Sequence, residues 1–215
     1  MKSSSHVDCA TMSKLSYGLF ILTTKDGIKD NGCVINTAVQ LTDNPVRVSI
    51  TLNKTNHTHD IISKTGVFNL SVLTESMPFH LIEQFGFHSG RDTDKFAASD
   101  GNARATNGIR YLTLHTNAMI SAKVIEPFDF GTHSLFVAEV TEAMVLSHEP
   151  SVTYQYYFDH IKPKPNTQTS KEHRKGFVCK ICGYVYEGDT LPDDFICPLC
   201  KHGANDFERW DYPQE

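Results

Sequence analysis

The 215-residue sequence lacks three features that would place it in other protein classes. It contains no run approaching the roughly 18 consecutive apolar residues of a membrane-spanning helix. Its first six residues, MKSSSH, do not begin the apolar core of a secretion signal. No Gly-x-Gly-x-x-Gly motif follows a predicted strand, so a nicotinamide-binding Rossmann domain is not indicated. We therefore expect a cytoplasmic protein without a membrane partner.

The sequence also has little excess of charge, and all of it lies at one end. Residues 176–215 contain three Lys or Arg and eight Asp or Glu, which accounts for the whole formal net charge of −5. Residues 1–175 are neutral, with 17 charges of each sign. Binding to nucleic acid needs a basic surface, so this distribution argues against a nucleic-acid partner. The acidic end suits docking to a basic patch on a partner protein, although an acidic surface also serves solubility alone.

Cysteine is scarce, yet four of the six cysteines form a regular pattern. Cys179 and Cys182 form one Cys-x-x-Cys pair and, after a gap of fourteen residues, Cys197 and Cys200 form a second. Four thiolates spaced in this way close a tetrahedral site around one metal ion, and both zinc and iron accept such a site. Thiols arranged as ligands rather than as a disulfide framework favour a reducing compartment.

We expect three segments along the chain: a domain at 1–161, a linker at 162–175 and a metal module at 176–215. The linker contains two prolines and no apolar residue, and its flexible span is about 20 Å. The module is dense in aromatic residues, which supply a small apolar shell, and metal binding should contribute much of its folding free energy. These aromatic residues are Tyr184, Tyr186, Phe195, Phe207 and Trp210.

Residues 1–161 are predicted to form a mainly β, antiparallel domain with few helices. One helix is expected over residues 60–64, capped by Thr58 and ended by Gly66, and a second over residues 75–85. Residues 86–110 are rich in Gly, Asp and Asn and should be mostly loop. Short strands with hairpin-length links favour a barrel over a parallel sheet. The predicted strands cover residues 17–24, 33–40, 46–52, 67–73, 111–124 (with an interruption) and 133–145.

Two polar segments have the composition of an anion site. Asn53, Lys54 and Thr58 combine a cation, amides and a hydroxyl just before a predicted helix, where free N–H groups favour phosphate. Residues 89–95 supply a second flexible and basic loop. Polar loops of this kind are common, so neither segment alone identifies a ligand.

The metal module resembles rubredoxin over VCKICGYVY (178–186) and LPDDFICPLC (191–200). That family binds one iron ion in four cysteines and passes single electrons. The loop between the two cysteine pairs is shorter than usual and resembles the rubredoxin-like part of rubrerythrins, and Phe195 stands where Trp is common. The resemblance implies iron at the four cysteines, with zinc as the alternative.

The first domain resembles the flavin reductase-like family, whose fold is a split β-barrel that binds FMN, usually as a homodimer. The resemblance covers residues from about 12 to 160. A barrel followed by a rubredoxin domain is similar to the high-molecular-weight rubredoxins. The segments that carry the resemblance occur in order as LSYGLF (15–20), DNGCVINT (30–37), NKTNHT (53–58), FHSGRDTDKF (87–96) and THSLFVAEV (132–140).

The resemblance implies a set of FMN contacts. Asn36 and Thr37 are expected at the isoalloxazine edge. His133 is expected near the reactive face as the catalytic residue, with a core histidine as the alternative. Cys33 is expected to be a packed thiol rather than a nucleophile. The resemblance also implies residues that contact the ribityl chain and the phosphate of FMN, or that belong to the loop covering them. These residues are Thr51, Asn53, Lys54, Thr58, Ser89, Gly90 and Lys95.

The two resemblances together imply an electron-transfer protein that contains FMN and iron. FMN would take electrons from NADH or NADPH, or from a rubredoxin reductase, and the iron would pass them singly to a protein acceptor. The resemblance suggests a flavodiiron protein that reduces oxygen or nitric oxide as that acceptor. Three alternatives stay open: a flavin reductase with an accessory tail, a carrier filled by a separate reductase, and a zinc-ribbon binding protein without a redox role.

Overall fold

A computed structural model of the chain describes residues 11, 14–97, 101–163, 176–180, 185–197 and 203–210. These residues divide into two compact units. One unit is drawn from residues 1–78 and 89–161, and the other from residues 79–88 and 162–215. Most of the predicted linker, residues 164–175, lies outside the described residues, so the domain boundaries stay a prediction.

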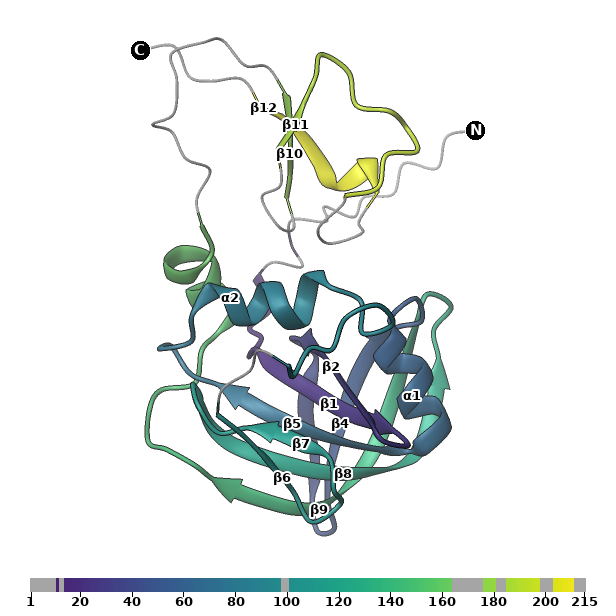
Figure 1. The fold of residues 1–215 in the computed structure, drawn as a ribbon, viewed down its shortest axis with the longest axis vertical. Coiled ribbons are helices and arrows are strands. Elements are labelled where there is room, and N and C mark those ends of the chain that lie inside the picture. Colours follow the sequence, from purple (N-terminus) through teal and green to yellow (C-terminus); the bar gives the residue numbers. More distant parts are fainter. Residues whose placement is uncertain are drawn as a thin grey trace. The chain divides into compact units, whose positions relative to one another are not determined.

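The first unit is built on a seven-stranded sheet in which every pair of neighbouring strands is antiparallel (Figure 1). This confirms the predicted mainly β fold, in which consecutive strands do not always pair. In sheet order the strands are β2 (Lys29–Ile35), β1 (Phe20–Asp26), β5 (Val67–Leu73), β8 (Thr116–Asp129), β9 (His133–Val145), β4 (Val46–Asn53) and β3 (Ala38–Asp43).

Alternation along the strands directs one face into a buried core. In β9, Ser134, Phe136 and Ala138 are buried, whereas His133 and Glu139 are exposed. Burial of apolar side chains of this kind is the main favourable term in folding. The core combines such residues from six strands with one from the helix that follows β4; among its members are Leu22, Ile50, Leu52, Ile62, Phe68 and Phe136.

Helix α1 (His57–Thr65) begins three residues before the expected start. The prediction that Thr58 caps it is wrong, because the Asn56 side chain accepts a hydrogen bond from the Thr58 backbone N–H at 3.0 Å. The predicted end is confirmed: Gly66 adopts a φ of 68° and its N–H donates to the carbonyl of Ile62. Figure 1 shows α1 lying against the strands of the first unit.

Two other expected elements differ from the structure. The strand predicted at 33–40 is interrupted at Asn36 and Thr37, where the Thr37 hydroxyl donates to the Thr51 carbonyl oxygen at 2.8 Å. The helix predicted at 75–85 begins only after Pro78, because proline disfavours helical backbone in the residue before it. It consists of α2 (Phe79–Ile82) and the π-turn η2 (Glu83–Phe87).

The remaining elements of the first unit are short. A small hairpin of β6 (Asn102–Arg104) and β7 (Arg110–Leu112) lies within the predicted loop region. The predicted interruption of the strand at 111–124 is confirmed, since β7 ends at Leu112 and β8 begins at Thr116. Helix α3 (Tyr154–Tyr156) and the π-turn η3 (Tyr157–Ile161) follow β9. Within the described ranges, no helix is long and apolar enough to cross a membrane.

The metal module folds around a three-stranded antiparallel sheet. Its order is β11 (Val185–Glu187), β10 (Gly176–Cys179) and β12 (Phe207–Trp210), and the 3₁₀ turn η4 (Ala204–Asp206) precedes β12. Three of the predicted aromatic residues pack on one another, with ring centroids 4.7 Å apart for Tyr186 and Phe195 and 5.3 Å apart for Phe195 and Phe207.

Candidate functional site

The predicted cofactor contacts of the barrel gather around the start of α1. Strand β4 ends at Asn53, and Asn53 pairs with His133 at the start of β9. The backbone N–H of Lys54 donates to the carbonyl oxygen of Thr132 at 3.0 Å. The end of β4, the start of α1 and the start of β9 therefore lie side by side.

The connection between β2 and β3 is fixed to the same end of β4. Thr37 and Asn36 form this two-residue connection, and both are partly buried. The hydrogen bond from the Thr37 hydroxyl to the carbonyl oxygen of Thr51 anchors it two residues before Asn53. Residues expected at the flavin ring and at the ribityl chain are thus neighbours in the structure.

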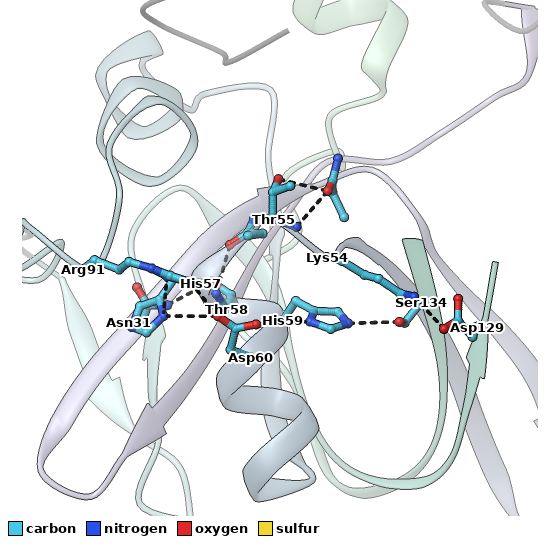
Figure 2. Close-up of polar contacts among 12 residues, drawn as sticks. Asn31, Lys54, Thr55, His57, Thr58, His59, Asp60, Arg91, Asp129 and Ser134 are labelled. Carbon is cyan, nitrogen blue, oxygen red and sulfur yellow. Dashed lines mark hydrogen bonds and ion pairs between the residues drawn. The ribbon is translucent and has the colours of Figure 1, made fainter. Parts of the chain in front are cut away.

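Side-chain hydrogen bonds hold the turn between β4 and α1. The Asn53 side-chain oxygen accepts hydrogen bonds from the backbone N–H and the hydroxyl of Thr55, both at 2.9 Å (Figure 2). The ammonium of Lys54 lies 2.5 Å from a carboxylate oxygen of Asp129. This hydrogen bond, with a second from the Gly131 backbone, lowers the pKa of Asp129. Lys54 is partly exposed and follows the last residue of β4, with its cation paired to Asp129.

A buried polar cluster lies beneath the start of α1. The Asn31 side-chain amide donates to the Thr58 hydroxyl at 3.0 Å, and both residues are almost fully buried. Gly90 passes so close that a Cβ added to it would lie 1.8 Å from Asn31 Oδ1. Only glycine fits at this position. Asn31 Oδ1 itself has no hydrogen-bond partner among the described residues.

Lys95 and Cys33 complete this cluster. The ammonium of Lys95 donates to the carbonyl oxygen of Gly32 at 2.8 Å, and only 4 % of Lys95 is exposed. Burial lowers the pKa of Lys95, while the neighbouring Cys33 opposes the shift. Burial raises the pKa of the Cys33 thiol, against hydrogen bonds from Thr58 and Asn56 and the charge of Lys95. A protonated Cys33 agrees with a packed thiol rather than a nucleophile.

Arg91 ties the loop that carries Ser89, Gly90 and Lys95 to the first turn of α1. Its guanidinium donates to Asp60 Oδ2 at 2.6 Å and lies 3.3 Å from His57 Nδ1. Within the loop, the Ser89 hydroxyl accepts a hydrogen bond from the Arg91 backbone N–H at 3.2 Å.

The predicted contacts therefore form an accessible set and a buried set. Thr58, Gly90 and Lys95 are buried and form the interior side of the site. His133 is exposed, and its Nδ1 lies 2.9 Å from the Thr132 hydroxyl, which disagrees with the core-histidine alternative. The accessible set also contains Asn36, Thr37, Thr51, Asn53, Lys54 and Ser89.

These residues suit a ligand that carries phosphate. The start of α1 and the Lys54 cation favour an anion. The close passage of Gly90 over Asn31 brings the loop backbone against the cluster. The helix start and the Lys54 cation therefore fit the phosphate of a cofactor such as FMN.

Sequence reasoning missed several members of the network. His59, Asp60, Arg91, Ser134 and Asn31 all contact it, and only folding brings them together (Figure 2). Asn31 and Arg91 stand within quoted family segments, but no local pattern sets them apart from their neighbours.

The described part of the metal module places two of the four predicted ligands together. Cys179 and Cys197 are 1 % and 0 % exposed and belong to one cluster with Phe207. Cys182 and Cys200 lie outside the described residues. Cysteine sulfur is a suitable donor for iron or zinc, and both described cysteines are buried in one cluster, so the residues present fit a metal ion.

Comparison with known families matches both parts of the chain. The model of the flavin reductase like domain matches residues 12–164. The model of the rubrerythrin, rubredoxin-like domain matches residues 177–208.

Individual proteins agree with these matches. The chain is 37 % identical to a high molecular weight rubredoxin of Moorella thermoacetica, over 94 % of this chain and 100 % of that protein. It is 37 % identical to a ferric-chelate reductase (NAD(P)H) of Archaeoglobus fulgidus, over 75 % of this chain and 94 % of that protein. Among solved structures, a Streptomyces globisporus NADH:FAD oxidoreductase shares the fold with a TM-score of 0.60 at 18 % identity, covering 66 % of this chain and 84 % of that one.

Proposed function

Because this chain belongs to the flavin reductase-like family and carries a rubredoxin-like domain after the barrel, as in the high molecular weight rubredoxins, we propose that it relays electrons from NAD(P)H through FMN to a single iron ion. The observation that carries the proposal is the joining of these two domains in one chain. The relative from Moorella thermoacetica matches along its whole length, so the same order of domains extends over both proteins.

The barrel residues would bind and orient FMN. When bound, FMN can accept a hydride and release electrons one at a time. Lys54 and the first turn of α1 would hold the phosphate, and Asn53 and Thr51 would line the path that leads to it. Asn36 and Thr37 would contact the edge of the isoalloxazine ring. The exposed His133 would stand at the face that the nicotinamide approaches. Thr58, Gly90 and Lys95 would fix the shape of this site from the buried side.

The four cysteines of the module would hold one iron ion. Cys179 and Cys197 are buried in the aromatic cluster. This cluster would keep water from a bound iron ion, which would supply single-electron chemistry rather than hydrolysis. Cys182 and Cys200 would complete the tetrahedral set. Zinc in the same four thiolates is the alternative, and it would give a binding module without a redox role.

The likeness to flavin reductases supports a homodimer of the barrel, with an exposed apolar surface as the dimer interface. Val39, Leu41 and Val46 of β3 and β4 are 44–59 % exposed. Val39 and Val46 line a groove together with seven other apolar residues of the same sheet. Apolar groups of this size are rarely left to water on a monomer. The acidic module would dock on a basic acceptor, for which we propose a protein of the flavodiiron class.

An absorption spectrum of the purified full-length chain tests the cofactors. The proposal expects flavin bands and ferric-thiolate bands together, with flavin retained through gel filtration. Loss of flavin on the column would support a flavin reductase that releases its product. A protein without ferric-thiolate bands, and with zinc rather than iron by metal analysis, would support the zinc-ribbon alternative and contradict the relay.

A second candidate function follows from the ferric-chelate reductase, which covers the barrel but only 75 % of this chain. The barrel alone would then reduce chelated ferric iron in solution. Comparison of the wild-type chain with Cys182→Ser separates the two functions. Undiminished reduction of ferric citrate by the variant supports the second function, whereas a reaction that requires the metal module supports the relay.

A further inference from the structure

The segment Phe79–His88 belongs to one part of the chain by sequence and to the other by structure. By sequence it lies within residues 12–164, which match the flavin reductase like domain. In the structure it forms one compact unit with residues 162–215, which contain the metal module. The flavin reductase-like domain therefore supplies a segment that packs as part of the metal-binding unit.

Phe87 is the residue of this segment that contacts the predicted metal ligands. It packs against the buried cluster of Cys179, Cys197 and Phe207. The other partly buried apolar side chains around this cluster all lie within residues 177–195 of the metal module. Among the described members of the cluster, Phe87 alone comes from the flavin reductase-like part of the sequence.

The local fold of the segment places Phe87 beside a second aromatic ring. Helix α2 begins at Phe79 and continues directly into η2, which ends at Phe87. Two turns of regular α-helix take about seven residues, whereas these two residues are eight positions apart. The wider π turn takes up the extra residue. The two rings therefore meet edge to face, with centroids 6.1 Å apart, and Phe79 supports the ring of Phe87.

The segment is anchored by side chains other than Phe87. Leu81, Ile82 and Phe85 are at most 7 % exposed, whereas Phe87 is only partly buried. Burial of these three apolar side chains stabilises the segment. Replacement of Phe87 therefore removes the contact with the cysteines and leaves the main apolar anchors of the segment in place.

The contact would affect the redox equilibrium of iron at the four cysteines. Iron held by four thiolates carries one net negative charge when ferric and two when ferrous. Apolar surroundings disfavour the more highly charged state. Exposure to solvent is accordingly one of the factors that set the reduction potential of iron–sulfur sites. A phenyl ring against two of the ligands would therefore disfavour reduction.

We infer that Phe87 is a positioning residue for the metal module: it closes the apolar shell over Cys179 and Cys197 and lowers the reduction potential of the iron. The inference rests on the proposed function, which assigns iron to the four cysteines. Linkage makes the effect reciprocal, so reduction of the iron weakens the Phe87 contact by the same factor. The module is therefore held against Phe79–His88 more tightly in the ferric state and is released more readily once it has accepted an electron.

Anaerobic redox titration of the iron-loaded, full-length chain measures this effect. In Phe87→Ala, we expect the ratio of ferrous to ferric iron at a fixed applied potential to rise by about threefold to tenfold. Phe87→Leu keeps an apolar side chain and should stay within about twofold of wild type. The matched control is Phe130→Ala, which removes a ring that is 66 % exposed and should not change the ratio. A ratio in Phe87→Ala that equals the wild-type value, or falls below it, would overturn the inference.

A second measurement tests the contact in the wild-type chain without redox chemistry. Zinc occupies a four-thiolate site but does not change its oxidation state. NMR of the zinc-loaded, full-length chain should show nuclear Overhauser effects between the ring protons of Phe87 and the β-protons of Cys179 and Cys197. Effects between Cys179 and Phe207, which pair across β10 and β12, serve as the internal reference. Presence of the reference effects without those of Phe87 would overturn the inference.

The outcomes separate this inference from the proposed function. Reduction of the iron by NADH in wild type, with an unchanged potential in Phe87→Ala, would overturn the role of Phe87 and leave the relay of electrons intact. Iron that NADH does not reduce, but that dithionite reduces at a higher potential in Phe87→Ala than in wild type, would overturn the relay and support the role of Phe87. A chain that takes up zinc and no iron would overturn both.

Discussion

Asp30 accepts hydrogen bonds from Arg110 Nε and from Arg104 Nη2 at the same carboxylate oxygen, each at 2.8 Å. The two arginines come from opposite strands of the β6–β7 hairpin, which they fix to the start of β2. The Asp30 side chain is only 10 % exposed. Asp30 immediately precedes Asn31 of the buried cluster, so this ion pair holds the base of the proposed site.

The ion pair predicts a dependence of stability on pH. Burial raises the pKa of Asp30, but the hydrogen bonds from Arg104 and Arg110 outweigh it and hold the pKa below its ordinary value of 3.8. The folded state therefore binds this proton less readily than the unfolded state. The stabilisation is complete above the unfolded pKa and is lost as pH falls through the lower, folded pKa.

Urea unfolding of wild type and Asp30→Asn at several pH values measures this effect. The variant should be less stable near pH 7, and the difference should shrink below about pH 4, the range of the unfolded Asp pKa. Asp26→Asn is the matched control, because its ion pair with Lys64 is mostly exposed. A difference between wild type and Asp30→Asn that stays constant down to pH 2 would contradict the role of the carboxylate charge.

Gly90→Ala should damage the site through Asn31. The new Cβ would lie 1.8 Å from Asn31 Oδ1, so Asn31 or the loop must move and the bond from Asn31 to Thr58 is strained. We expect a loss of about 1–3 kcal/mol in the free energy of unfolding and weaker flavin binding. Gly203→Ala is the control, since its Cβ would meet nothing within 4 Å. Chemical denaturation and fluorescence titration with FMN measure both effects; equal behaviour of the two variants would contradict the close passage.

Lys95→Met should destabilise the covering loop. The change keeps the length of the side chain but leaves the Gly32 carbonyl oxygen without its hydrogen bond at 2.8 Å. A buried acceptor that loses its donor costs about 1–3 kcal/mol. Hydrogen exchange of the backbone amides of residues 89–97 should become faster than in Lys29→Met, whose ammonium makes an exposed hydrogen bond at 3.2 Å. Unchanged exchange in Lys95→Met would show that the buried ammonium does not hold the loop.

Cys182→Ser should separate the two cofactors. Removal of one thiolate opens the proposed metal site, and a module of this size depends on its metal to fold. We expect iron to fall from one ion per chain to none, while FMN stays in the barrel. Cys33→Ser, within the barrel, should keep iron. Elemental analysis and flavin absorbance give both numbers, and loss of flavin from Cys182→Ser would contradict the independence of the two parts.

Much of the fold was predictable because its strands are rich in apolar and β-branched residues and are bounded by turns. The bounds expected for β5 and β9, at 67–73 and 133–145, agree with the structure, since Gly66 and the Gly131 turn mark where these apolar segments begin. The start of α1 was misplaced because Asn56 and Thr58 are both good capping residues. Only the backbone shows that Asn56 has extended geometry and accepts the capping bond.

The site was less predictable than the fold. Lys54, Thr51 and Asn53 could be named because they lie close together in sequence and match a family segment. Asn31 meets Thr58 across 27 residues, and His59 meets Ser134 across 75. Such contacts depend on the pairing of β4 with β9 and on the packing of α1, which a single sequence does not specify.

Anaerobic stopped-flow mixing of the full-length chain with NADH tests whether electrons pass from flavin to iron within one chain. The flavin bands and the ferric-thiolate bands are followed in the same reaction. We expect the flavin to bleach first and the iron then to be reduced, with a flavin-to-iron ratio of one in each chain. Flavin that bleaches while the iron stays ferric on the timescale of turnover would contradict the internal relay.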